Sequence, residues 1–102
     1  MRYLLQRGYK LAARNYRTRR GEIDLIMRQN DAIVFVEVKL RRGTGFGDPL
    51  EAVTAHKQDT LRSVAEHYVY TRKPSFDTLR FDVIGILADR PEVRIHHIED
   101  AF

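Results

Sequence analysis

The sequence lacks cysteine, internal repeats, low-complexity tracts and long apolar runs. Without cysteine, a disulfide framework, a thiolate zinc site, an iron–sulfur cluster and a cysteine nucleophile are all excluded. The longest apolar stretch, Ala32 to Val36, is far shorter than the roughly 20 residues that span a bilayer. The apolar segment near the N-terminus, Tyr3 to Leu5, is too short for a secretory signal. We therefore expect a cytoplasmic protein with no membrane partner.

The composition is that of one folded domain with a basic balance. The chain has 102 residues, which predicts a single domain over residues 1–102. Apolar residues make up 43% and charged residues 31%, which is typical of a globular protein rather than a disordered one. The net charge of +4 favours an anionic partner, with nucleic acid ahead of a membrane surface.

Two runs around a turn-forming segment predict an antiparallel hairpin. Glu22 to Arg28 alternates polar and apolar residues, and Ala32 to Leu40 is apolar on both faces, as in a covered central strand. The other expected elements are a helix at Arg2–Arg7, a strand at Tyr9–Tyr16, a helix from Pro49 to about Arg72 with Asp48 as its N-cap, and strands at Leu79–Leu87 and Glu92–Ile98. This order predicts an α/β fold with a single mixed sheet of about five strands flanked by helices.

Acidic residues interrupt both strands of the hairpin. With the turn centred on residues 29–30, Glu22 lies opposite Glu37, and Asp24 lies diagonal to Glu37. Diagonal neighbours are roughly 7–8 Å apart at the backbone, so two carboxylates there could hold one ion between them. Lys39 shares the face of Glu37 because the two residues are two apart on a strand. The sequence therefore predicts one patch of three carboxylates and an ammonium.

Such a patch has a chemical use. Taking charges out of water costs several kcal/mol each unless they are paired or bind a metal. Oxygen ligands favour Mg²⁺ or Mn²⁺ over Zn²⁺, and such an ion can polarise a phosphodiester and acidify a water molecule. The alternative is a solvated surface ion pair worth under about 1 kcal/mol. The apolar context of Glu37, with Asp24 on the preceding strand, favours the catalytic interpretation.

These residues resemble the PD-(D/E)xK nuclease superfamily, whose restriction-endonuclease-like fold includes archaeal Holliday junction resolvases. The chain more closely resembles the bacterial YraN family, whose biochemical role is poorly defined. The segments that carry this resemblance are Gly8-Tyr9, Arg14-Asn15-Tyr16-Arg17, Gly21-Glu22-Ile23-Asp24-Leu25-Ile26, Val34-Phe35-Val36-Glu37-Val38-Lys39, Phe46-Gly47-Asp48-Pro49, Glu51-Ala52-Val53 and Arg80-Phe81-Asp82-Val83-Ile84.

The resemblance implies a restriction-endonuclease-like fold and hydrolysis of phosphodiester bonds in DNA, with branched or structured DNA suggested by the resolvases. It implies Asp24 and Glu37 as ligands of Mg²⁺ or Mn²⁺, the Val38 carbonyl as a further ligand, and Lys39 as the catalytic lysine. Members of the family usually have a longer first helix that carries a Glu reaching the site. We expect that helix to be shortened here. Glu22 is a partial substitute for the missing carboxylate in one interpretation, but the favoured role of Glu22 is to balance nearby arginines.

The shortened helix leaves the activity open. The leading interpretation is a Mg²⁺-dependent endonuclease with a reduced set of ligands. The alternative is a catalytically weak or inactive nucleic-acid-binding module of the same fold. A third interpretation is a protein-interaction subunit with an acidic partner. A homodimer would suit the cutting of two strands, although no residue requires one.

Basic residues flank the predicted patch. Arg19 and Arg20 precede the hairpin, and Arg41 and Arg42 follow it, so we expect both clusters near one end of the two strands, where they could hold phosphates. For Arg19 and Arg20, a solvated basic surface is an equal alternative. Lys57 falls on the apolar stripe of the long helix, where a lysine either extends past the edge of the core to solvent or points into the site. We favour the second, with Lys57 as a phosphate contact. DNA is favoured over RNA as the partner.

A further carboxylate lies outside this patch. Asp82 sits in an apolar run, and we expect it to pair with a basic residue such as Arg80 or one across the sheet. His96 and His97 point to opposite faces of their strand, so we do not expect them to bind a metal as a pair.

Overall fold

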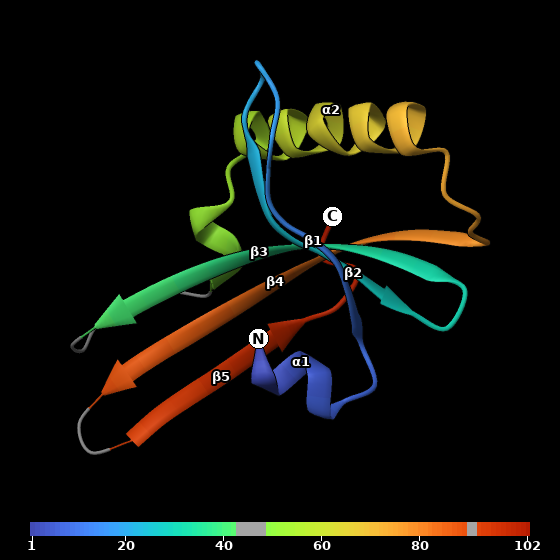
Figure 1. Cartoon of the computed structure of the whole chain (residues 1–102). Helices are drawn as coiled ribbons and strands as arrows, with labels where there is room; N and C mark the ends of the chain where they lie inside the picture. The colour runs from blue at the N-terminus through green and yellow to red at the C-terminus, as the bar shows by residue number, and fades with distance from the viewer. Residues whose placement is uncertain (43–48, 90–91) are drawn as a thin grey trace.

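The protein is built on one mixed five-stranded sheet with the strand order β1-β2-β3-β4-β5 (Figure 1). The computed structural model describes residues 1–42, 49–89 and 92–102. Its elements are α1 (Arg2–Gln6), β1 (Lys10–Arg17), β2 (Glu22–Gln29), β3 (Ala32–Arg42), the 3₁₀ helix η1 (Pro49–Ala52), α2 (Ala55–Arg72), β4 (Thr78–Asp89) and β5 (Glu92–Ile98). The predicted α/β class and the predicted number of strands are confirmed. No helix within these described ranges has the length and hydropathy needed to cross a membrane.

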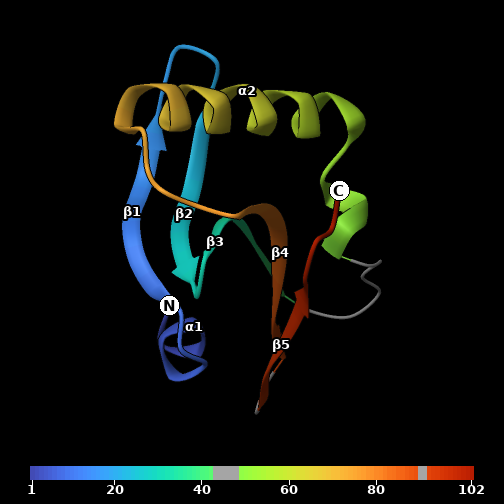
Figure 2. The ribbon, with the colours of Figure 1, turned by 90° about the vertical axis from the view of Figure 1, so that its right-hand side faces the viewer.

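The helices cover opposite faces of the sheet. Figure 2 shows α2 lying across one face, with α1 below the sheet on the other side. Strands β1, β2 and β3 pair antiparallel, β3 pairs parallel with β4, and β4 pairs antiparallel with β5. A parallel pair needs a crossover connection, and here that connection contains α2. The central position predicted for β3 is confirmed.

The turn between β2 and β3 is one residue later than predicted. Gln29 pairs with Ala32, so residues 30–31 form the turn. Asn30 has a φ of 51°, a left-handed conformation that asparagine tolerates because its short side chain can hydrogen-bond locally. The predicted centre at residues 29–30 is therefore wrong. The correction moves every partner by two positions along β3, which leaves each side chain on its expected face.

The predicted long helix is two helices. Val53 and Thr54 lie between η1 and α2, and the extended backbone of Thr54 (φ −65°, ψ 166°) separates the two helices. The Thr54 hydroxyl accepts a hydrogen bond from the Lys57 backbone N–H at 3.2 Å, so threonine caps the start of α2. The predicted N-cap, Asp48, lies outside the described residues. Because α2 starts at a cap, the orientation of its first turn is fixed.

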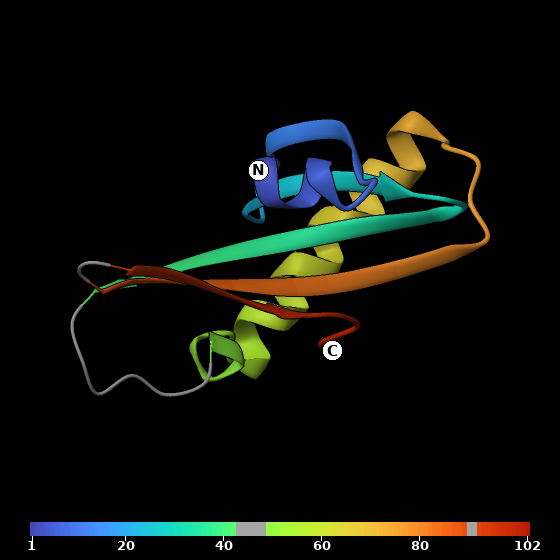
Figure 3. The same cartoon turned by 90° about the horizontal axis from the view of Figure 1, so that it is seen from below.

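The sheet has an apolar core on each face. The core under α2 includes Ile33 and Phe35 of β3, and the core on the α1 side includes Val34 and Val36 of the same strand. All four side chains are at most 2% exposed. Seen from below in Figure 3, β3 lies between β2 and β4, with α1 on the near side and α2 on the far side. Strand β3 is therefore shared by both cores.

A glycine lets η1 approach the sheet closely. Gly85 of β4 pairs with Lys39 of β3, and a Cβ atom placed on Gly85 would collide with the ring of Pro49. Pro49 is buried at this contact. The chain leading into α2 is therefore held against β4, next to the predicted site.

We expect Gly85→Ala to lower the free energy of unfolding by about 1–3 kcal/mol, because the new methyl group overpacks against Pro49. Urea denaturation measures this change. In the Pro49→Ala background the same substitution should cost less, with a coupling energy above about 0.5 kcal/mol. Strictly additive effects would show that the two residues do not compete for one space.

Candidate functional site

Strands β2 and β3 separate where the acidic residues lie. Their backbone register runs from Gln29 opposite Ala32 to Leu25 opposite Val36. One residue further on, Asp24 Oδ2 accepts a hydrogen bond from the Val38 backbone N–H at 2.8 Å. A side chain thus takes the place of a backbone partner. In Figure 1, β1 and β2 then rise past α2 while β3 continues along the sheet.

Glu37 lies where the two strands diverge, on the α2 side of β3, and is 4% exposed. Its Oε2 atom is 3.4 Å from Lys57 Nζ and 3.7 Å from Lys39 Nζ. Lys39 comes from the same strand, while Lys57 comes from the first turn of α2, which the Thr54 cap orients. The structure thus brings Asp24, Glu37, Lys39 and Lys57 together, with Val38 tied to Asp24.

Glu37 holds its proton more tightly than an ordinary carboxyl group. Its pKa is raised to about 7: burial is the largest cause, the hydrogen bond and the negative charge of Asp24 raise it as well, and the ammonium groups of Lys57 and Lys39 lower it. Near pH 7 about half of the Glu37 side chains are therefore protonated. Above that pH a second negative charge develops in a buried place, and a bound cation would relieve it.

Glu22 does not join this group. It was expected opposite Glu37, but its Oε1 atom lies 3.3 Å from Arg17 Nε in an ion pair on the β1–β2 ribbon. The corrected turn already moves the expected partner of Glu22 from Glu37 to Lys39, and the strands are no longer paired beyond Leu25. The favoured expectation, that Glu22 balances a nearby arginine, is confirmed. The site thus contains two carboxylates from the predicted set rather than three.

The two arginine clusters lie apart. Arg19 and Arg20 occupy the turn between β1 and β2, which rises beside α2, whereas Arg41 and Arg42 lie at the far end of β3 (Figures 1 and 2). The expectation that both clusters flank one end of the hairpin is wrong. It assumed that β2 and β3 stay paired throughout, whereas they diverge at Asp24.

A second acidic group lies on the opposite face. Asp82, His97 and Glu99 each offer a ligand atom within 4.8 Å of the others, so this group could hold a metal ion. His97 Nε2 is 2.7 Å from Asp82 Oδ2, and Asp82 is 1% exposed. His97 was not expected in this role, because the alternation of a strand was applied to it only as a partner of His96.

Arg80 already compensates this second group. Its guanidinium contacts both oxygens of Asp82 at 2.9 Å, and Nη2 also lies 2.6 Å from Tyr9 Oη and 3.2 Å from Glu99 Oε1. The predicted pairing of Asp82 with Arg80 is confirmed. The same surroundings raise the pKa of Arg80, and burial raises the pKa of Tyr9 to about 12. A metal ion here would have to displace the guanidinium from the centre of the group.

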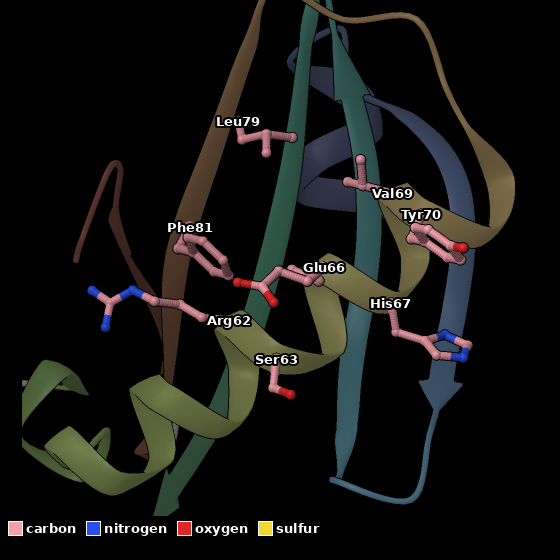
Figure 4. A pocket seen from close by; sticks show the side chains of 9 residues that line it. Arg62, Ser63, Glu66, His67, Val69, Tyr70, Leu79 and Phe81 are labelled. Atoms are coloured by element: carbon pink, nitrogen blue, oxygen red, sulfur yellow. The ribbon is translucent and has the colours of Figure 1, made fainter.

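A hollow of about 770 Å³ lies elsewhere, between α2 and the start of β4 (Figure 4). Leu79 and Phe81 of β4 and Ala65 and Val69 of α2 contribute apolar lining. Its lining includes neither Asp24 nor Glu37, so the size of a cavity does not locate the acidic pair.

The pKa of Glu37 makes stability depend on pH. The Glu37 carboxyl group loses its proton near pH 4.5 in the unfolded chain and near pH 7 in the folded chain. The free energy of unfolding of the wild type therefore falls as the pH rises from 4.5 to 7. Glu37→Gln has no proton to release. We expect its free energy of unfolding to gain about 1–3 kcal/mol relative to wild type across this interval. Urea denaturation at several pH values measures the difference.

Glu66→Gln, at an exposed position of α2, is the matched control. Solvent surrounds that carboxylate, so its pH profile should follow that of the wild type. A Glu37→Gln profile parallel to the wild type would show that Glu37 is not held in its protonated form.

Comparison with known sequences identifies the family. Residues 1–86 match the description "Uncharacterised protein family UPF0102". A UPF0102 protein of Syntrophomonas wolfei is 46% identical over 98% of this chain and 87% of its own length. UPF0102 proteins of Rhodococcus opacus and Alkaliphilus oremlandii are 44% and 47% identical, over 99% and 98% of this chain and 86% and 87% of their own. The chain therefore belongs to the UPF0102 (YraN) family, which has a restriction-endonuclease-like fold.

Proposed function

We propose that this protein is a nuclease that uses Mg²⁺ or Mn²⁺ to hydrolyse phosphodiester bonds in DNA. The observation that carries the proposal is the buried pair of Asp24 and Glu37, with two lysine ammonium groups within 4 Å of one Glu37 oxygen. Buried carboxylates and lysines of this kind are what metal-assisted phosphoryl chemistry requires. The resolvase resemblance extends the proposal to branched or structured DNA.

The donor set fits a hard divalent cation. Asp24 and Glu37 offer carboxylate oxygens from two strands, and we assign the Val38 carbonyl as a further ligand; all are oxygen donors, as Mg²⁺ and Mn²⁺ prefer. Such an ion would polarise the phosphoryl oxygen and lower the pKa of a water molecule. Glu37 must lose its proton before its carboxylate can bind the ion, so metal binding should strengthen as the pH rises.

The lysines have a separate task. Lys39 and Lys57 both contact Glu37 Oε2. A metal ion bound to Glu37 would replace them as its counter-charge, and the two ammonium groups could then bind an anion. We assign Lys39 to orient the attacking water or to steady the charge that develops on the phosphate. Lys57, which is more exposed than Lys39, would hold a phosphate oxygen of the substrate.

A second function has its own support. The charge of Glu37 is already reduced by its own proton and balanced by two lysines, and Glu22, the expected third carboxylate, is paired with Arg17. These groups compensate the buried charge without a metal ion. The alternative is therefore a nucleic-acid-binding module of the same fold with weak catalysis or none.

Metal binding tests the site without a choice of substrate. We expect wild-type protein to bind Mn²⁺ in isothermal calorimetry more tightly near pH 8 than near pH 6, because the carboxyl pair must lose its proton. Asp24→Asn should weaken binding by at least about tenfold, or about 1.4 kcal/mol. Glu99→Gln, in the other acidic group, should leave it unchanged. The reverse result would place the ion beside Asp82.

Cleavage tests the chemistry. With Mg²⁺ or Mn²⁺ and a panel of linear and branched DNA, Asp24→Asn and Lys39→Ala should each lower the rate by about 10²-fold or more. Lys10→Ala, an exposed lysine on β1, is the control and should keep the wild-type rate. Equal background rates in all four proteins would contradict the nuclease. Salt-sensitive DNA binding without cleavage would support the binding module instead.

A further inference from the structure

A basic hollow of about 400 Å³ lies between the β1–β2 turn and α2. Its lining consists of Arg17, Thr18, Arg19, Arg20, Ser63 and His67. Arg17 ends β1, the next three residues belong to the turn, and Ser63 and His67 come from the middle of α2. No residue of the Glu37 site is among them.

The turn between β1 and β2 lies in close contact with α2 beside this hollow. A Cβ atom on Gly21 would lie 2.7 Å from Thr60 Cγ2 of α2, so only glycine lets the turn approach the helix this closely. Within the turn, Thr18 N–H bonds to the Gly21 carbonyl at 2.8 Å and Arg20 N–H bonds to the Thr18 hydroxyl at 3.1 Å. The turn is thus closed by its own hydrogen bonds and rests on α2.

The charge of the hollow is largely uncompensated. Arg17 pairs with Glu22, but Arg19 and Arg20 form no ion pair within the described ranges, and both are exposed. No acidic side chain lines the hollow. Two guanidinium groups with free N–H donors are well suited to the oxygens of a phosphate.

His67 adds a directed donor. Figure 4 shows its ring extending from α2 toward β1, where Nδ1 lies 2.7 Å from Tyr16 Oη. When the tyrosine hydroxyl donates to Nδ1, the proton of a neutral imidazole resides on Nε2 and is available to an acceptor. The Ser63 hydroxyl lies on the same hollow, one turn earlier in α2. Neutral donors from the helix therefore face the arginines of the turn.

We propose that this hollow binds a phosphate group of the DNA backbone that flanks the bond to be cleaved. In this arrangement a second phosphate, the reacting one, lies at the Glu37 site. Only the position of that second phosphate rests on the proposed function. With a rise of about 1.5 Å per residue, Ser63 and His67 lie about 9 and 15 Å along α2 from Lys57. A duplex whose axis follows α2, with a rise of about 3.4 Å per base pair, would thus be held about three to four base pairs from the reacting phosphate.

The test measures DNA affinity without any metal. In EDTA, fluorescence anisotropy of a labelled duplex should give a Kd about tenfold higher for the double variant Arg19→Ala/Arg20→Ala than for the wild type. The slope of log K against log salt should also become shallower by about one to two. Ser63→Asp, which adds a negative charge and removes no arginine, should raise the Kd as well. Arg94→Ala, at an exposed position of β5, is the control and should change the Kd less than twofold.

Equal Kd values for the hollow variants and Arg94→Ala would overturn the inference. Calorimetry with inorganic phosphate separates the two sources of this anion: a wild type that binds phosphate but not the duplex would overturn the assignment to DNA. A wild type that binds the duplex through this hollow but never cleaves it would support the inference and contradict the nuclease. The two proposals therefore fail in different experiments.

Discussion

The hydrogen bond from Val38 N–H to Asp24 determines how the site is arranged. It ends the pairing of β2 with β3 by giving a carboxylate the backbone donor that the next strand would otherwise have taken. The same contact brings the Asp24 carboxylate against Glu37 and lets the β1–β2 ribbon rise beside α2. The acidic pair and the basic hollow thus both follow from the separation of β2 and β3.

The two buried carboxylates of the sheet differ in how their charge is compensated. Asp82 is held by both arms of the Arg80 guanidinium and by His97, a geometry that leaves little to exchange. Glu37 has two single ammonium contacts at 3.4 and 3.7 Å, and its raised pKa of about 7 means that it holds a proton part of the time near neutral pH. A proton and lysine contacts of that length can be exchanged for a ligand. This difference supports the proposed location of the chemistry at Glu37 rather than at Asp82.

Sequence alone predicts what depends on local periodicity. The hairpin, the central strand and the face shared by Asp24 and Glu37 follow from alternation, and they survive a turn misplaced by one residue because the register moves by two. The neighbours of Asp82 on β5 also follow from the order of residues along the chain. The pairing of β4 with β5 places Ile84 opposite His97, and counting two residues further along each strand puts Glu99 beside Asp82.

Tertiary pairing supplies what periodicity does not encode. No turn joins β3 directly to β4, since α2 lies between them, so counting cannot reveal that Val83 lies opposite Glu37. Val83 is fully buried. On the other side of Glu37, α2 places one charged group, Lys57, within ion-pair distance of it. Desolvation is consequently the largest cause of the raised pKa of Glu37. The acidic motif is readable in the sequence, whereas its proton affinity near neutral pH is a consequence of the parallel pairing that buries it.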